Sequence, residues 1–154
     1  MSDWKRSTKE IPFEGLPLEM ATAINQQIEQ YQLGPILSDS LVCIQTNSEK
    51  VKKGLFGKAE TLQVGAMVTP RWLLWAIHGT DKQVAVLSAQ LINITVQDYA
   101  QTSLAKMIPD SGIEVNGIFT DAGESVSAFI GLEENAAGNQ FKEAIIKAAQ
   151  DAKK

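Results

Sequence analysis

TLQVGAMVTPRWLLWAI, residues 61–77, is rich in large apolar side chains and is broken by a turn signal at Pro70. The pattern predicts two β-strands, one on each side of that proline. Trp72 and Trp75 lie three residues apart, so a regular strand directs them to opposite faces. One of the two is therefore expected in the core, and the other is expected to be exposed or covered by a helix.

Further short apolar runs alternate with turn residues on both sides of this stretch. In residues 92–97 and 112–120, apolar and polar side chains alternate, as is typical of a half-buried strand. The predicted strands cover 41–46, 61–69, 71–77, one or two segments within 84–99 with a bend near Ser88, Ala89 and Gln90, then 112–120 and 125–132. About seven short strands without intervening helices favour a sandwich or a small barrel and argue against a parallel α/β sheet.

An amphipathic helix is predicted at each end of the strand region. The first covers residues 16–33, with Pro17 at its first position, and the second covers 139–152, with Asn139 as a candidate N-cap. The apolar stripes are Met20, Ile24, Ile28 and Tyr31 in the first helix, and Phe141, Ile145, Ala148 and Ala152 in the second. Each stripe needs an apolar surface to pack on.

The N-terminal segment carries mixed charge and few large apolar groups. Residues 1–15 are therefore predicted to be a polar tail that docks at most locally and does not define the fold. The domain organisation expected from this pattern has two parts. Residues 1–37 hold the tail and the first helix, which packs on the domain, and residues 38–154 form the strand domain.

AMVTPRWLLWA, residues 66–76, resembles the strand-turn-strand signature of bacterial pleckstrin-homology-like (PH-like) domains. The matching positions are held by Thr69, Arg71, Leu73 and Leu74. LSAQLINITV, residues 87–96, resembles the following strand of the family, and FKEAIIKAA, residues 141–149, resembles its C-terminal helix. Pro70 and Trp72 depart from the family pattern. The resemblance covers roughly residues 38–152, so the helix at 16–33 lies outside it.

This resemblance implies a mainly β fold with flanking helices. The expected architecture is a strongly bent, antiparallel, seven-stranded barrel capped by the C-terminal helix, with the N-terminal helix added to it. Domains of this family bind lipid head groups, peptides or one another. Because a fold does not by itself imply a function, the resemblance predicts a binding scaffold and names no ligand.

Composition narrows the classes of function. The chain of 154 residues has a formal net charge of −4, which gives it no overall attraction to nucleic acid. With one cysteine, Cys43, and one histidine, His78, the usual metal-ligand spacings and a catalytic triad are not expected. The polar N-terminus and the lack of a long apolar run predict a cytoplasmic protein. No enzyme activity and no cofactor are predicted.

The stretch KVKKGLFGKAE, residues 50–60, sets lysines around a Leu-Phe pair that is bracketed by glycines. Its candidate binding residues are Lys50, Lys52, Lys53, Leu55, Phe56 and Lys58. By the resemblance, this is the loop between the first two strands, which supplies cations to phosphates in lipid-binding members. In one interpretation the lysines meet anionic head groups while the apolar pair enters the interface. In the other, the pair folds back on the barrel or meets a second subunit.

Arg71 is the remaining candidate binding residue. In one interpretation its planar guanidinium faces a ligand beside the lysine-rich loop, where it suits phosphate. In the other it pairs with a carboxylate or caps backbone carbonyls. The sequence as a whole predicts a non-catalytic binding or assembly module that contacts a protein partner or another copy of itself. The contacts would use the lysine-rich loop and an exposed sheet edge or the extra helix. The alternative is peripheral association with anionic lipid at the inner membrane face, through the same loop.

Overall fold

The computed structural model describes the whole chain except residues 1–3, 51–59, 81 and 120–121. In the described part, five antiparallel strands form one sheet in the order β1-β2-β3-β4-β5, and three form a second sheet in the order β6-β7-β8. The strands are β1 Trp4–Glu10, β2 Val42–Lys50, β3 Glu60–Val68, β4 Trp72–Gly79, β5 Ala85–Gln90, β6 Thr95–Asp98, β7 Gly112–Phe119 and β8 Ser125–Gly131. The helices are α1, Leu18–Gln30, and α2, Ala136–Ala152. Short 3-10 helices lie at Phe13–Gly15, Ile36–Asp39, Leu91–Asn93, Tyr99–Gln101 and Ser103–Lys106.

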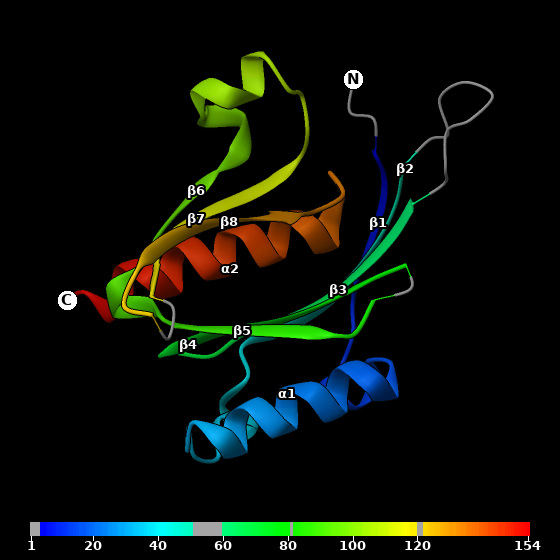
Figure 1. Ribbon diagram of the computed structural model, residues 1–154. Helices are drawn as coiled ribbons and strands as arrows, with labels where there is room; N and C mark the ends of the chain where they lie inside the picture. Colours follow the sequence, from blue (N-terminus) through cyan, green and yellow to red (C-terminus); the bar gives the residue numbers. More distant parts are fainter. Residues whose placement is uncertain (1–3, 51–59, 81, 120–121) are drawn as a thin grey trace.

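The elements stack in layers. Helix α2 lies between the two sheets, and α1 covers the other face of the five-stranded sheet (Figure 1). Phe141 and Ile145 of α2 are fully buried in a core to which both sheets contribute. Met20 and Ile24 of α1 are fully buried in a second core on the opposite face of the five-stranded sheet. Both predicted helix stripes thus supply the residues that anchor the helices.

The two tryptophans of β4 divide between these cores as predicted. Trp75 is fully buried on the α2 side, and Trp72 is partly buried on the α1 side. Ala66, opposite Trp75 in β3, belongs to the α2 side as well. Because both faces of this sheet are covered, its central strands carry the long apolar runs seen in the sequence.

The prediction of a mainly β fold with a helix near each end is confirmed. Every predicted strand region contains a strand. The described residues form eight strands rather than seven, and the sheets do not join into a closed barrel. The bend between β5 and β6 lies at Leu91–Asn93 instead of residues 88–90. Asn135, rather than Asn139, caps α2, because its side chain accepts the Gly138 N–H at 2.8 Å.

The prediction of a polar tail over residues 1–15 was wrong for Trp4–Glu10. These residues form β1, which pairs with β2 along its whole length. The strand lacks an apolar face, so no period-2 hydrophobic pattern signals it. Polar contacts hold it instead. Thr8 Oγ1 lies 2.8 Å from Thr46 Oγ1, and the backbone N–H of Glu133 donates to Thr8 Oγ1 at 2.8 Å.

Side chains, not backbone pairs, link β1 to the second sheet. Arg6 donates to both carboxylate oxygens of Asp110, at 3.0 Å and 2.6 Å, and also to Ser48 Oγ at 2.6 Å. Its guanidinium lies 5.4 Å from the ring centroids of Trp4 and Phe129. A Cβ atom at Gly131 would overlap the guanidinium, so the glycine permits this close approach. The two sheets therefore meet along this side without sharing a ladder.

Candidate functional site

The predicted binding residues fall in two places. Lys50 is exposed and ends β2. Lys52, Lys53, Leu55, Phe56 and Lys58 lie outside the described residues. The lipid and subunit alternatives for this stretch both stay predictions.

Arg71 lies at the other end of β3 from Glu60 and its partner Lys50. It is exposed and sits in the turn before β4, where Thr69 Oγ1 accepts its N–H at 3.3 Å and the Trp72 N–H at 2.9 Å. Strand β3 has nine residues, which separate this turn from Glu60 by about 30 Å. The strand arrangement thus does not bring Arg71 and Lys50 to one site. A small cavity beside Arg71 also holds Asp39.

The outer edge of β5 is unpaired among the described residues. The strand pairs with β4 from Ala85↔Ile77 to Gln90↔Trp72, and it ends the sheet order. The Leu91 N–H donates to the Arg71 carbonyl at 2.9 Å, so every second residue before Leu91 also turns its backbone groups toward β4. Since the bonding direction alternates along a strand, the residues whose N–H and C=O groups point outward are Val86, Ser88 and Gln90.

This edge also lacks the features that usually protect one. Edge strands commonly carry charges or proline, or are very short or covered. Strand β1 carries Lys5, Arg6, Lys9 and Glu10, and β6 has four residues and ends at Asp98, which pairs with Lys142 of α2 at 2.9 Å. Strand β8 also has no charge and no proline over Ser125–Gly131, and Arg6 lies against its last residue, Gly131. Ala85–Gln90 has neither a charge nor a proline over its six residues.

A groove of about 470 Å³ runs beside β5, and we call it the β5 groove. It is lined by Gln27, Tyr31, Leu33, Trp72, Val86, Leu87, Ser88, Ile118 and Phe119. Tyr31 and Phe119 are 42% and 62% exposed. Phe119 is the last residue of β7. The open edge thus has aromatic side chains close to it.

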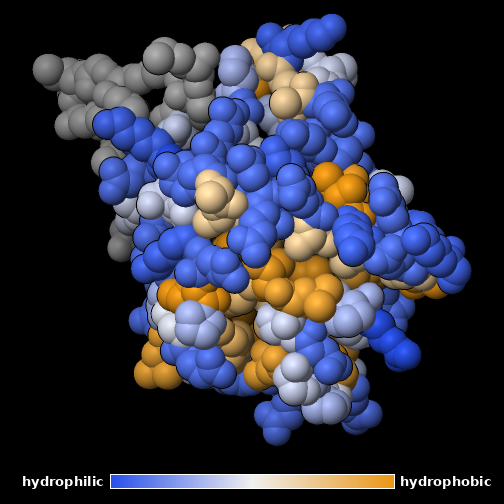
Figure 2. Space-filling model, turned by 180° about the vertical axis from the view of Figure 1, so that it is seen from behind, coloured by the Kyte–Doolittle hydropathy of each residue, from blue (hydrophilic) through white to orange (hydrophobic). Residues whose placement is uncertain are grey.

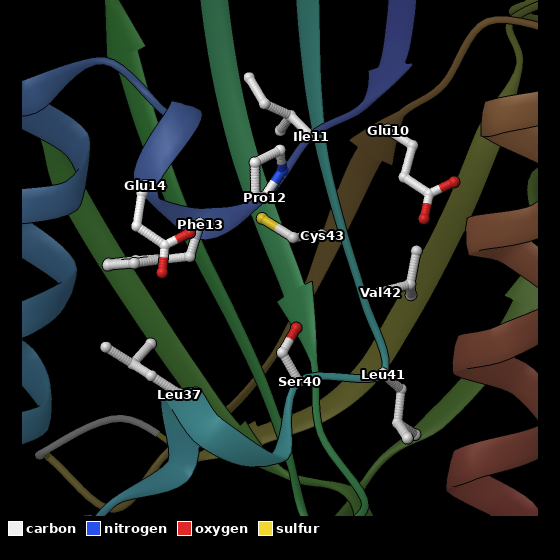
Figure 3. Close-up of a pocket in the computed structure, with 10 residues that line it drawn as sticks. All are labelled: Glu10, Ile11, Pro12, Phe13, Glu14, Leu37, Ser40, Leu41, Val42 and Cys43. Atoms are coloured by element: carbon white, nitrogen blue, oxygen red, sulfur yellow. The ribbon is translucent and has the colours of Figure 1, made fainter.

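A second groove, the Cys43 groove, lies where β1 leaves β2. The ladder ends with Glu10↔Ile44, and one more bond joins the Ile11 N–H to the Cys43 carbonyl at 3.0 Å. Pro12 has no N–H to continue it. The groove, of about 590 Å³, is lined by Glu10, Ile11, Pro12, Phe13, Glu14, Leu37, Ser40, Leu41, Val42 and Cys43 (Figure 3). Apolar surface also gathers across the middle of the face turned away in Figure 1 (Figure 2).

Cys43 is buried at the floor of this groove and is not poised as a nucleophile. Burial raises the pKa of its thiol to about 12, and the nearby Glu14 carboxylate adds to the rise. Only the thiolate is reactive, so at neutral pH the folded protein presents a nearly inert thiol.

Alkylation of Cys43 is accordingly expected to be slow in the folded protein. A pKa of about 12, against 9.0 for the free thiol, lowers the thiolate fraction roughly a thousandfold. Iodoacetamide labelling at pH 8, followed by mass spectrometry, measures the rate in the folded and urea-unfolded chain. Equal rates in the two states would contradict this account of the thiol.

Other candidate chemistry is sparse in the described part of the chain. His78 lies near the end of β4 with its Nδ1 3.4 Å from Glu19 Oε2. The described residues hold no group of three or more metal-ligating side chains. Within the same residues, neither helix has the length and apolarity needed to cross a membrane.

No family model matches the chain, and neither does any curated protein or any solved structure. The functional argument therefore depends on the fold and on the two grooves.

Proposed function

We propose that this protein is a non-catalytic binding module of PH-like architecture that takes up an extended segment of a protein partner along the edge of β5. The single observation that carries the proposal is the unpaired, uncharged β5 edge beside the β5 groove. An extended peptide that joins such an edge gains main-chain hydrogen bonds, and pockets next to the edge select its side chains.

The layer arrangement supports the PH-like part of the proposal. Two antiparallel sheets with a C-terminal helix packed on both resemble the expected scaffold, although they do not close into a barrel. The peripheral lipid alternative depends on residues 51–59, and no described contact favours it.

Replacing Ser88 with proline is expected to weaken peptide binding at least about fivefold. Proline removes the outward N–H of Ser88 and leaves the ladder with β4 intact, and one main-chain hydrogen bond contributes about 1 kcal/mol before any steric effect. The probes are short random peptides selected by phage display on the natural protein. Fluorescence anisotropy then measures their affinity for each variant.

The matched control is Ser88→Ala. It removes the hydroxyl that accepts from Gln27 Nε2 at 3.0 Å, but it keeps the backbone N–H. This variant is expected to bind the selected peptides as the natural protein does. If the peptides bind Ser88→Pro equally well while circular dichroism shows it folded, they do not use the β5 edge and the proposal fails.

A further inference from the structure

The Cys43 groove combines an apolar floor with an acidic rim. Leu41, at its mouth, is 57% exposed, and Val42 and Cys43 follow it along β2. Glu10 and Glu14 lie on opposite sides of the Cys43 thiol in Figure 3, and both are exposed.

The rim charges are uncompensated in the described part of the chain. The groove lining contains no lysine, arginine or histidine. Glu10 and Glu14 take part in no ion pair among the described residues. A ligand that suits this groove therefore carries positive charge next to large apolar groups.

We propose that the Cys43 groove receives residues 50–58 of a second copy of this chain. That segment, KVKKGLFGK, sets four lysines around Leu55 and Phe56. The apolar pair matches the floor, and the lysines match Glu10 and Glu14. The flanking glycines, Gly54 and Gly57, place no side chain next to the pair.

Chain length argues against the same apolar contact within one copy. Lys50 and Glu60 are paired neighbours at one end of the sheet. At about 3.5 Å per residue, the backbone of a nine-residue connection spans at most roughly 17 Å from that end. The floor of the groove lies at Leu41–Cys43, about 25 Å down β2, so we assign Leu55 and Phe56 to the floor of another copy.

The groove lies at the start of β2 and the segment follows its end, so the two surfaces that meet are different ones. The contact is then either reciprocal, in a two-fold dimer where each segment enters the other copy's groove, or it repeats from copy to copy in a ring or open chain. It lies at the β1 side of the sheet and β5 lies at the other, so the inference does not depend on the proposed function.

The direct test is binding of a fluorescein-labelled peptide of residues 48–61 to the full-length protein. The host protein carries Leu55→Ser and Phe56→Ser, so that its own segment does not compete. Saturable binding is expected. Adding Glu10→Gln and Glu14→Gln to the host is expected to weaken it about fivefold or more, because two charge pairs are lost. Higher salt is expected to weaken it as well.

The control host carries Glu29→Gln and Glu143→Gln in addition to the two serines. These remove the same charge from exposed positions of α1 and α2, away from the groove, and are expected to leave binding unchanged. Sedimentation velocity on the natural chain is expected to show association that increases with concentration and is lost in the Glu10/Glu14 variant.

Two results would overturn the inference. One is a peptide that fails to bind at about 1 mM or binds the two charge variants equally. The other is a natural chain that stays monomeric and sediments with anionic phospholipid vesicles through Leu55 and Phe56, which would make lipid the contact of this segment. Loss of peptide binding at β5 affects neither readout, so the two proposals fail separately.

Discussion

Replacing Phe141 with alanine is expected to lower the free energy of unfolding by about 3 to 5 kcal/mol. Phe141 is fully buried in α2, and its core receives side chains from both sheets. The substitution removes the ring and leaves a cavity that the sheets on either side cannot readily fill. A loss of this size is a large share of the roughly 5 to 15 kcal/mol that stabilises a typical domain.

Urea titration followed by circular dichroism measures this loss. The matched control is Glu143→Ala, two residues along the same helix at an exposed position, where the change is expected to stay within about 0.5 kcal/mol. A Phe141→Ala variant that unfolds within 1 kcal/mol of the natural protein would contradict the placement of α2 between the sheets.

Replacing Arg6 with alanine is expected to lower the free energy of unfolding by about 3 kcal/mol. The Arg6 and Asp110 side chains are 8% and 12% exposed, and loss of the guanidinium leaves the Asp110 carboxylate without its main partner. Removing one member of a largely buried pair is strongly destabilising because the other charge stays desolvated. The change also removes the contacts to Ser48 and to the Trp4 and Phe129 rings.

A double-mutant cycle separates the contribution of the Arg6–Asp110 ion pair from that of the other Arg6 contacts. Arg6→Ala combined with Asp110→Ala is expected to cost less than the sum of the two single changes, because neither charge is then left alone. Lys5→Ala, at an exposed neighbouring position of β1, serves as the control and is expected to change the stability little. Additive single effects would show that the pair does not join the sheets.

The sequence predicted those elements whose signal is local. Trp72 and Trp75 identify a strand covered on both faces, and the stripe from Met20 to Ile24 identifies α1. Strand β1 could not be predicted in this way. Its inward residues Arg6 and Thr8 are polar, and their partners, Asp110 and Glu133, come more than 100 residues later.

The candidate sites divide in the same manner. The charge-free run of residues 84–92 is readable in the sequence, but its value as an open edge depends on which strands pair, and pairing is a tertiary property. The Cys43 groove lies where Pro12 ends the β1–β2 ladder, and no sequence pattern near Leu41 predicts a groove at this place. The planar guanidinium of Arg71 suits phosphate, but the length of β3 separates Arg71 from Lys50.

The position of β1 affects how the chain folds during synthesis. Its side-chain partners at Asp110, Glu133 and Asn135 leave the ribosome long after Trp4 does. Strand β1 is thus synthesised first but gains its side-chain contacts among the last. Contacts between distant parts of a chain slow folding. We expect nascent chains truncated before residue 110 to remain sensitive to protease along Trp4–Glu10, and full-length chains to become resistant there.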